Sequence, residues 1–303
     1  MIGITGVAVG EEEASLACCP VCNDRQNVSF QFDRNGYHIH LCRECNVEFA
    51  FPQPTDAELA SIYTSSYFLG SESESAARQV AQMKRATAKL YLDAIAQFID
   101  VQRPRLLELG CGSGDFLVEA QHRGFGAEGL EYSEHAAQAA NGRLGRNAVL
   151  VGSLDTVDLP SQGYDVVAGF DVIEHVRSPK HSVRSIYSLL KPRGIVAIVT
   201  PSLDSWSRRV LGRHWMEYKP EHITYLSRKS LRRLLEGAGF MEFHFVPNYK
   251  VLTFDYIVRH FDRFPVPVVS PLLRMIRKLL PAALANRSFK IVASGTMAIA
   301  RRG

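Results

Sequence analysis

Long apolar runs are absent from this 303-residue chain, and neither sign of charge dominates it. No window approaches the roughly 18 uninterrupted apolar residues that a membrane-spanning helix needs. The first ten residues lack a basic segment and run straight into Glu11–Glu13, so they do not resemble a secretory signal. We therefore expect a cytoplasmic protein. The net charge of +4 does not by itself indicate any class of partner.

Cysteine is scarce over most of the chain, because five of the six cysteines lie within the first 45 residues. In a chain expected to be cytoplasmic, this crowding favours metal binding over disulfides. Two Cys-x-x-Cys pairs, Cys19/Cys22 and Cys42/Cys45, flank 19 residues whose alternating pattern predicts a hairpin. This spacing is typical of a four-thiolate zinc ribbon. Since thiolates fill all four positions, we expect the Zn²⁺ to be structural.

The pattern of the chain predicts three parts. Residues 1–51 form the zinc-ribbon module, residues 52–104 a linker with N-terminal helices, and residues 105–303 an α/β domain. In the linker, Thr55 and Glu58 have the spacing of a capping box that opens a helix. From residue 105 onward strand-like runs alternate with helical stretches, which predicts a parallel sheet covered by helices on both faces.

An amphipathic and basic insertion at about 249–287 precedes a final strand predicted at 290–300. From residue 250 to the end, the chain has ten Lys and Arg residues against two Asp residues. Four roles stay open for this insertion: packing on the sheet, covering the active site, forming a homodimer, or peripheral contact with a membrane surface.

A glycine turn follows the strand predicted at 106–109, with glycines at 110, 112 and 114. Glycine is suited to a turn that a ligand approaches closely and whose φ can be positive. The spacing is Gly-x-Gly-x-Gly with Glu108 just before it, whereas Gly-x-Gly-x-x-Gly cradles a pyrophosphate. Glu131 ends the next predicted strand, where a carboxylate can accept hydrogen bonds from both ribose hydroxyls. Tyr132 can then lie against an adenine; the alternative is a surface glutamate followed by a core tyrosine.

These motifs, with residues 164–167 and 190–194, resemble class I S-adenosylmethionine (SAM)-dependent methyltransferases over about residues 75–250. The likeness is strongest to the branch that includes ubiquinone-biosynthesis O-methyltransferases and many sugar, antibiotic and polysaccharide-pathway methyltransferases. It implies a Rossmann-like methyltransferase sheet and a SAM site formed by Glu108, Gly110, Gly112, Gly114, Glu131, Tyr132, Phe170 and Asp171. Such families often place an acid after the third strand. Here the run is Gly-Ser-Leu-Asp at 152–155, so Ser153 and Leu154 are the candidates, with Asp155 nearby.

Methyl transfer from SAM is an in-line displacement, in which the protein positions the acceptor and, for a hydroxyl, removes its proton. Two Glu-His pairs are candidates for this chemistry. The first is Glu174-His175, after the fourth predicted strand. In the ubiquinone-pathway relatives an acid-x-x-Glu-His element is associated with a divalent metal, and Asp171, Glu174 and His175 match it. These three can hold Mg²⁺; alternatively, Glu174 braces the loop and His175 packs over the methyl group.

The second pair is Glu221-His222, in a segment that resembles the one over the substrate mouth in the same branch. His222 is a candidate general base, because the unperturbed pKa of about 6.5 lies near working pH. Glu221 would then orient the ring; the alternative is a structural histidine bonded to a loop backbone. The candidates for an aromatic acceptor pocket, or for simple packing, are Trp206, Trp215 and Tyr218.

The leading hypothesis is methyl transfer to a hydroxyl of a small acceptor, whether a sugar, polyketide, quinone-like or lipid-linked metabolite. C- and N-methylation stay open. A rival is an rRNA-base methyltransferase, since zinc ribbons precede some of those. However, the chain lacks an Asn-Pro-Pro-Tyr-type motif and its ribbon is not markedly basic, so we expect no nucleic-acid partner. A third hypothesis is a SAM-binding scaffold without turnover.

Overall fold

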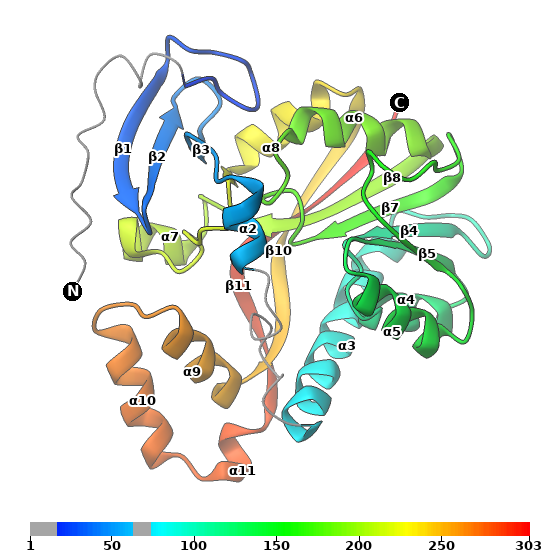
Figure 1. Ribbon diagram of the computed structural model, residues 1–303. Coiled ribbons are helices and arrows are strands. Elements are labelled where there is room, and N and C mark those ends of the chain that lie inside the picture. Colours follow the sequence, from blue (N-terminus) through cyan, green and yellow to red (C-terminus); the bar gives the residue numbers. More distant parts are fainter. Residues whose placement is uncertain (1–16, 63–73) are drawn as a thin grey trace.

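The structure is a computed structural model that describes residues 17–62 and 74–303. The start of the chain, from which we expected no secretory signal, lies outside the described residues. A large sheet has the strand order β10-β11-β8-β7-β4-β5-β6 (Figure 1). Strands β8, β7, β4, β5 and β6 run parallel, while β11 is antiparallel to β8 and β10 to β11. The strands are β4 (Arg105–Leu109), β5 (Gly126–Glu131), β6 (Val149–Val151), β7 (Tyr164–Phe170), β8 (Leu190–Pro201), β10 (Phe240–Thr253) and β11 (Ser288–Arg302).

Helices cover both faces of this sheet, which confirms the predicted α/β fold with a Rossmann-like methyltransferase sheet. Successive residues of a strand point to opposite faces, so Val196 and Ile198 of β8 contribute to one core and Ala197 and Val199 to the other. The first core is shared with α6 (Pro179–Leu189) and α8 (Arg228–Glu236). The second is shared with α3 (Glu74–Ala96), α4 (Asp115–His122) and α5 (Glu134–Leu144).

The cysteine-rich N-terminal part of the chain contributes three strands to a second, four-stranded sheet of order β1-β2-β3-β9. Its first three strands are β1 (Val28–Arg34), β2 (Tyr37–Cys42) and β3 (Val47–Ala50). The fourth, β9 (Thr224–Leu226), comes from far along the chain and pairs antiparallel with β3. The ribbon is therefore completed by a strand that the sequence analysis did not foresee.

The linker helix α2 (Asp56–Ile62) begins directly after the predicted capping box. The Glu58 carboxylate accepts hydrogen bonds from the Thr55 N–H at 2.6 Å, and the Glu58 N–H donates to Thr55 Oγ1 at 3.2 Å. The short helices α7 (Trp206–Leu211) and η1 (Gly212–His214) follow β8. No helix among the described residues is long and apolar enough to cross a bilayer.

The insertion expected at 249–287 is partly strand. β10 continues to Thr253, and Lys250 and Leu252 pair with β11 beyond the point where β8 ends. Three helices follow β10 and precede β11 in the sequence: α9 (Phe254–Arg263), α10 (Val269–Leu279) and α11 (Ala282–Ala285). The strands extend further than expected because each satisfies the hydrogen-bonding groups of the other.

Candidate functional site

The glycine turn connects β4 to α4 at the carboxyl edge of the parallel strands. Gly110, Gly112 and Gly114 have φ angles of 63°, 53° and 77°, a region that favours glycine. A Cβ on Gly110 would lie 2.9 Å from Cγ2 of Val172, and one on Gly114 would lie 3.0 Å from Cβ of Ala140. The turn therefore requires glycine both for its conformation and for its space.

Glu131 ends β5 beside this turn. Its carboxylate accepts hydrogen bonds from the Gly112 N–H at 2.8 Å and from the Ser133 N–H at 2.9 Å. These bonds fix the carboxylate at the mouth of the turn and leave further acceptor positions on its oxygens. The next residue, Tyr132, is 85% exposed, which excludes the alternative of a core tyrosine.

Glu108 is buried at the end of β4, and its Oε2 has no hydrogen-bond partner in the described part of the chain. Burial, with the nearby charges of Asp115 and Glu131, raises the pKa of Glu108 well above its usual value. Asp115 is itself held by Arg143 at 2.7 Å. A buried polar atom without a partner is costly. Three carboxyl groups thus converge where a cationic, hydrogen-bond-donating ligand would satisfy the Glu108 oxygen.

The other expected SAM contacts also follow the ends of parallel strands. Ser153, after β6, caps a turn in which its N–H donates to Thr156 Oγ1 at 2.8 Å. Leu154 is partly buried against the core, and Asp155 pairs with His181 at 2.8 Å. Phe170 ends β7 and packs against the rings of Tyr91 and Phe116, with centroids 4.8 and 4.7 Å away. Asp171 follows it with a φ of 55°.

One cluster combines both residues of the first Glu-His pair with the histidine of the second pair, which lies far along the chain. Glu174, His175 and His222 each offer a possible ligand atom, and these atoms lie within 4.8 Å of one another. The imidazole rings are edge to face, with centroids 4.7 Å apart. Only the tertiary fold unites them, since Ile223, which follows the second pair, donates its N–H to the Glu174 carbonyl at 2.9 Å.

Backbone carbonyls set the tautomers of both histidines. Nδ1 of His175 lies 3.0 Å from the Glu221 carbonyl oxygen, and Nδ1 of His222 lies 2.9 Å from that of Glu217. A carbonyl oxygen can only accept, so each Nδ1 carries the proton and each neutral ring has its lone pair on Nε2. Burial lowers the pKa of His175, and burial with the neighbouring His175 and Lys219 lowers that of His222 well below its usual value. Both rings are therefore neutral near pH 7.

Glu174 is the third member of the cluster, and its side chain is buried. Its Oε2 accepts a hydrogen bond from Thr200 Oγ1 at 3.0 Å, and its Oε1 has no hydrogen-bond partner in the described part of the chain. Burial, with the nearby charge of Asp171, raises the pKa of Glu174 to about 8. The carboxyl group thus carries a proton at neutral pH and can donate one hydrogen bond.

Three details of the site are arranged differently from the expected chemistry. Asp171 does not join Glu174 and His175 as a metal ligand, because Lys250 of β10 holds its carboxylate at 2.7 Å. The group that completes the cluster is His222, and two imidazoles suit a transition metal better than Mg²⁺. Glu221 does not orient His222; the Glu217 carbonyl does.

The third detail concerns the aromatic candidates, for which an acceptor pocket or simple packing was expected. Trp215 and Tyr218 are fully buried in a cluster with residues of the ribbon strands, which favours packing, while Trp206 is exposed on α7. The Tyr218 hydroxyl donates to Glu48, which also pairs with Arg208 at 2.8 Å. Packing against the ribbon removes these rings from the acceptor site.

Sequence reasoning missed Glu217, whose largely buried side chain lies beside the cluster. Burial would raise the pKa of Glu217, but the charges of Lys219, His222 and His260 and a hydrogen bond from Ser294 outweigh it, so the pKa is lowered. Glu217 is therefore a fixed negative charge near His222. The one indication of this role in the sequence is that Glu217 lies five residues before His222.

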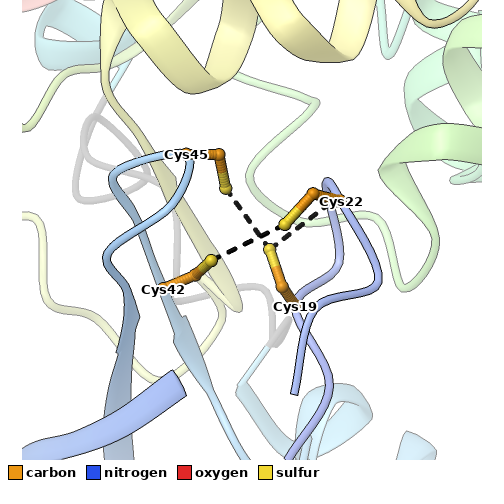
Figure 2. Close-up of side chains that lie close together, drawn as sticks. All are labelled: Cys19, Cys22, Cys42 and Cys45. Carbon is orange, nitrogen blue, oxygen red and sulfur yellow. Dashed lines mark hydrogen bonds between the residues drawn. The ribbon is translucent and has the colours of Figure 1, made fainter. Parts of the chain in front are cut away.

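The four predicted cysteine ligands converge on one point (Figure 2). Sγ of Cys19 lies 3.4 Å from that of Cys45, and Sγ of Cys22 lies 3.6 Å from that of Cys42. All are free thiols, and tetrahedral Zn²⁺ with Zn–S bonds of about 2.3 Å needs sulfurs about 3.8 Å apart. The N–H groups of Val21 and Cys22 donate to Cys19 Sγ at 3.4 Å. This donor set fits zinc, and Cys18 lies outside it.

The ribbon is attached to the segment that carries His222. Besides the β3–β9 pairing, the Ala50 N–H donates to the Ile223 carbonyl at 3.0 Å, and Ser227 Oγ donates to the Asn46 carbonyl at 2.7 Å. Lys229 Nζ donates to the carbonyl of Glu44, which is next to Cys45, at 2.6 Å. The residues that form these bonds come shortly after His222 in the chain, so the ribbon holds the segment that carries His222 in place.

Comparison with known proteins decides the family. Residues 80–241, more than half of the chain, match a family model described as a methyltransferase domain. The chain belongs to the SAM-dependent methyltransferase family. It is 33% identical over 138 residues to a Mycolicibacterium smegmatis protein named "Probable S-adenosylmethionine-dependent methyltransferase", covering 45% of this chain and 51% of that protein.

The other relatives of this methyltransferase agree at lower identity. A ubiquinone biosynthesis O-methyltransferase of Neisseria meningitidis is 29% identical over 118 residues, covering 37% of this chain and 50% of that one. The chain spans about half the length of the curated relatives it matches. Among solved structures, a chain of the complex between the Haloferax volcanii Trm112 methyltransferase activator and a methyltransferase has a TM-score of 0.50 at 18% identity. It covers 74% of this chain and 93% of its own, a likeness of fold.

Proposed function

We propose that this protein transfers the methyl group of SAM to a hydroxyl of a small acceptor placed against the histidine cluster. The observation that carries the proposal is the meeting of Glu174, His175 and His222. Glu174 and His175 come directly after Val172 and Ile173, and Val172 packs against Gly110 of the glycine turn. The segment with Glu174 and His175 follows β7, and the glycine turn follows the neighbouring strand β4. A donor bound at the turn therefore faces an acceptor at the histidine cluster. Sugar, polyketide, quinone-like and lipid-linked hydroxyls remain the acceptor classes.

The donor site in this proposal is the turn with Glu108 and Glu131. Glu131 accepts hydrogen bonds from the ribose hydroxyls, and the exposed Tyr132 ring covers the adenine. The unpartnered Oε2 of Glu108 accepts a hydrogen bond from the amino group at the methionine end. SAM supplies a methyl group already activated on a positively charged sulfur. The converging carboxyl groups favour that positive charge over the neutral product.

His222 is the general base of the proposed reaction. Its ring is neutral near pH 7, its lone pair is on Nε2, and the Glu217 carbonyl holds its orientation. When Nε2 takes the proton of the acceptor hydroxyl, the negative charge of Glu217 stabilises the imidazolium. The protonated Glu174 donates a hydrogen bond that orients the acceptor oxygen or the base. His175 packs edge to face on His222 and keeps water from the cluster.

An assay with isotopically labelled SAM tests this function. Pools of small hydroxylated acceptors are incubated with the protein, and products are identified by mass spectrometry. We expect a labelled methyl ether with wild-type protein and none with His222→Gln, which keeps SAM affinity. Labelling of ribosomal RNA instead would favour the rRNA-base hypothesis. SAM binding without any product would favour a scaffold, and loss of SAM affinity in His222→Gln would make the histidine structural.

A further inference from the structure

The helices α9, α10 and α11 lie at one end of the large sheet (Figure 1), where Gln79 of α3 donates a hydrogen bond to Asn286 Oδ1 at 3.0 Å. α9 begins where β10 ends, and Thr253 caps it by accepting a hydrogen bond from the Tyr256 N–H on its Oγ1 at 3.1 Å. α10 packs on α9 and is joined to it by two ion pairs, Arg277–Asp255 at 2.8 Å and Arg274–Asp262 at 2.5 Å. The two helices therefore form a fixed platform.

One face of α10 is apolar and exposed. Val268, Leu272, Met275 and Leu279 are 78%, 47%, 55% and 79% exposed. Leu272, Met275 and Leu279 lie on one side of the helix because they are three and four residues apart, and Val268 directly precedes the helix. We call these four residues the α10 stripe. Single exposed apolar residues are normal, whereas a continuous row of them marks an interaction surface.

Cations border the stripe. Arg274 and Lys278 are exposed and lie one helical turn apart, on the flank next to Met275 and Leu279. The charge of Arg274 is compensated by Asp262, so Lys278 is the cation that a membrane phosphate would meet. The part of the chain from residue 250 onward has ten Lys and Arg residues and two Asp residues. An apolar face edged by cations is the pattern of helices that lie in the headgroup layer of anionic membranes.

Membrane docking suits this surface better than pairing with a second copy. A two-fold interface brings the same patch of both copies together, and α10 contains no acidic side chain that could pair with Lys278 of the other copy. An anionic phosphate complements Lys278 instead. The 11 residues of α10 fall well short of the roughly 20 needed to cross the bilayer, so the helix lies along the surface.

We propose that the α10 stripe docks this protein on an anionic membrane surface. The four apolar side chains enter the boundary between headgroups and acyl chains, and Lys278 contacts a lipid phosphate. This docking is independent of which acceptor is methylated.

Vesicle flotation with the full-length protein tests the proposal. We expect the protein to float with vesicles of phosphatidylglycerol and phosphatidylcholine, and weakly with phosphatidylcholine alone. The double variant Leu272→Glu/Leu279→Glu should lower vesicle affinity about tenfold or more, and Lys278→Gln about fivefold. The matched control is Val101→Glu, an exposed apolar residue between α3 and β4, which should bind as wild type. SAM affinity and circular dichroism report folding in each variant.

Two results would overturn docking. One is equal flotation of the double variant and wild type, or no flotation of either. The other is a concentration-dependent dimer in sedimentation velocity that the double variant abolishes while neither binds vesicles, which would assign the stripe to a second copy.

Discussion

Loss of the ribbon metal should disable catalysis while leaving donor binding intact. The perturbation is Cys42→Ser, which removes one of four ligands that converge within 4.8 Å of one another. A structural zinc site supplies much of the folding free energy of a small ribbon, so we expect the ribbon strands to loosen. The matched control is Cys18→Ser, because Cys18 lies next to the cluster without belonging to it.

The magnitude follows from the bonds between the ribbon and the His222 segment. Besides the β3–β9 pairing, three hydrogen bonds join the two: Ala50 to Ile223, Ser227 to Asn46, and Lys229 to Glu44. At about 1 kcal/mol each they contribute about 3 kcal/mol to the placement of His222. Each 1.4 kcal/mol corresponds to a factor of ten, so kcat should fall about a hundredfold. The donor site lies at β4 and β5, so the Kd of SAM should change little.

Two measurements check this expectation. Isothermal titration calorimetry gives the Kd of SAM, and the labelled-methyl assay gives kcat, for Cys42→Ser, Cys18→Ser and wild type. Metal content by mass spectrometry should show one zinc per chain lost only in Cys42→Ser. Full activity in the zinc-free variant would refute the bracing role of the ribbon. Equal losses of kcat and SAM affinity would show instead that the whole chain had unfolded.

Three further predictions concern the methyl-transfer site itself. Glu131→Ala removes the acceptor at the mouth of the turn, so calorimetry should show SAM affinity falling about tenfold or more; unchanged affinity would refute the donor site. Gly110→Ala places a Cβ 2.9 Å from Val172 at a φ of 63°, so thermal unfolding should show that the free energy of unfolding falls by about 1–3 kcal/mol. The matched control is Gly142→Ala, whose Cβ meets nothing within 4 Å and should cause no such loss. The pKa of about 8 for Glu174 makes its protonated form the active one, so kcat should be highest below that pH and fall as pH rises through it. Glu174→Gln, which mimics the protonated carboxyl, should remove that fall; a pH profile identical to wild type would exclude Glu174 as its origin.

Local patterns in the sequence were enough for much of the scaffold. The glycine spacing at 110–114 predicted a turn of positive φ, because few other residues adopt that conformation. The Cys-x-x-Cys pairs predicted the thiol cluster, and the Thr55–Glu58 spacing predicted the start of α2. In each case the interacting groups lie close in the chain or their spacing has one common structural solution. The alternation of strands and helices likewise fixed the α/β fold.

The cluster of Glu174, His175 and His222 was decided by tertiary structure. His175 and His222 were identified separately, but their meeting accompanies the pairing of β9 with β3 of the ribbon, which only the folded chain shows. Long-range packing also formed the ion pair between Asp171 and Lys250 and buried the side chain of Trp215. A sequence pattern reports which residue types are available and what their local backbone prefers. Which charges and rings become neighbours depends on contacts between segments tens to hundreds of residues apart, and those are determined only when the whole chain packs.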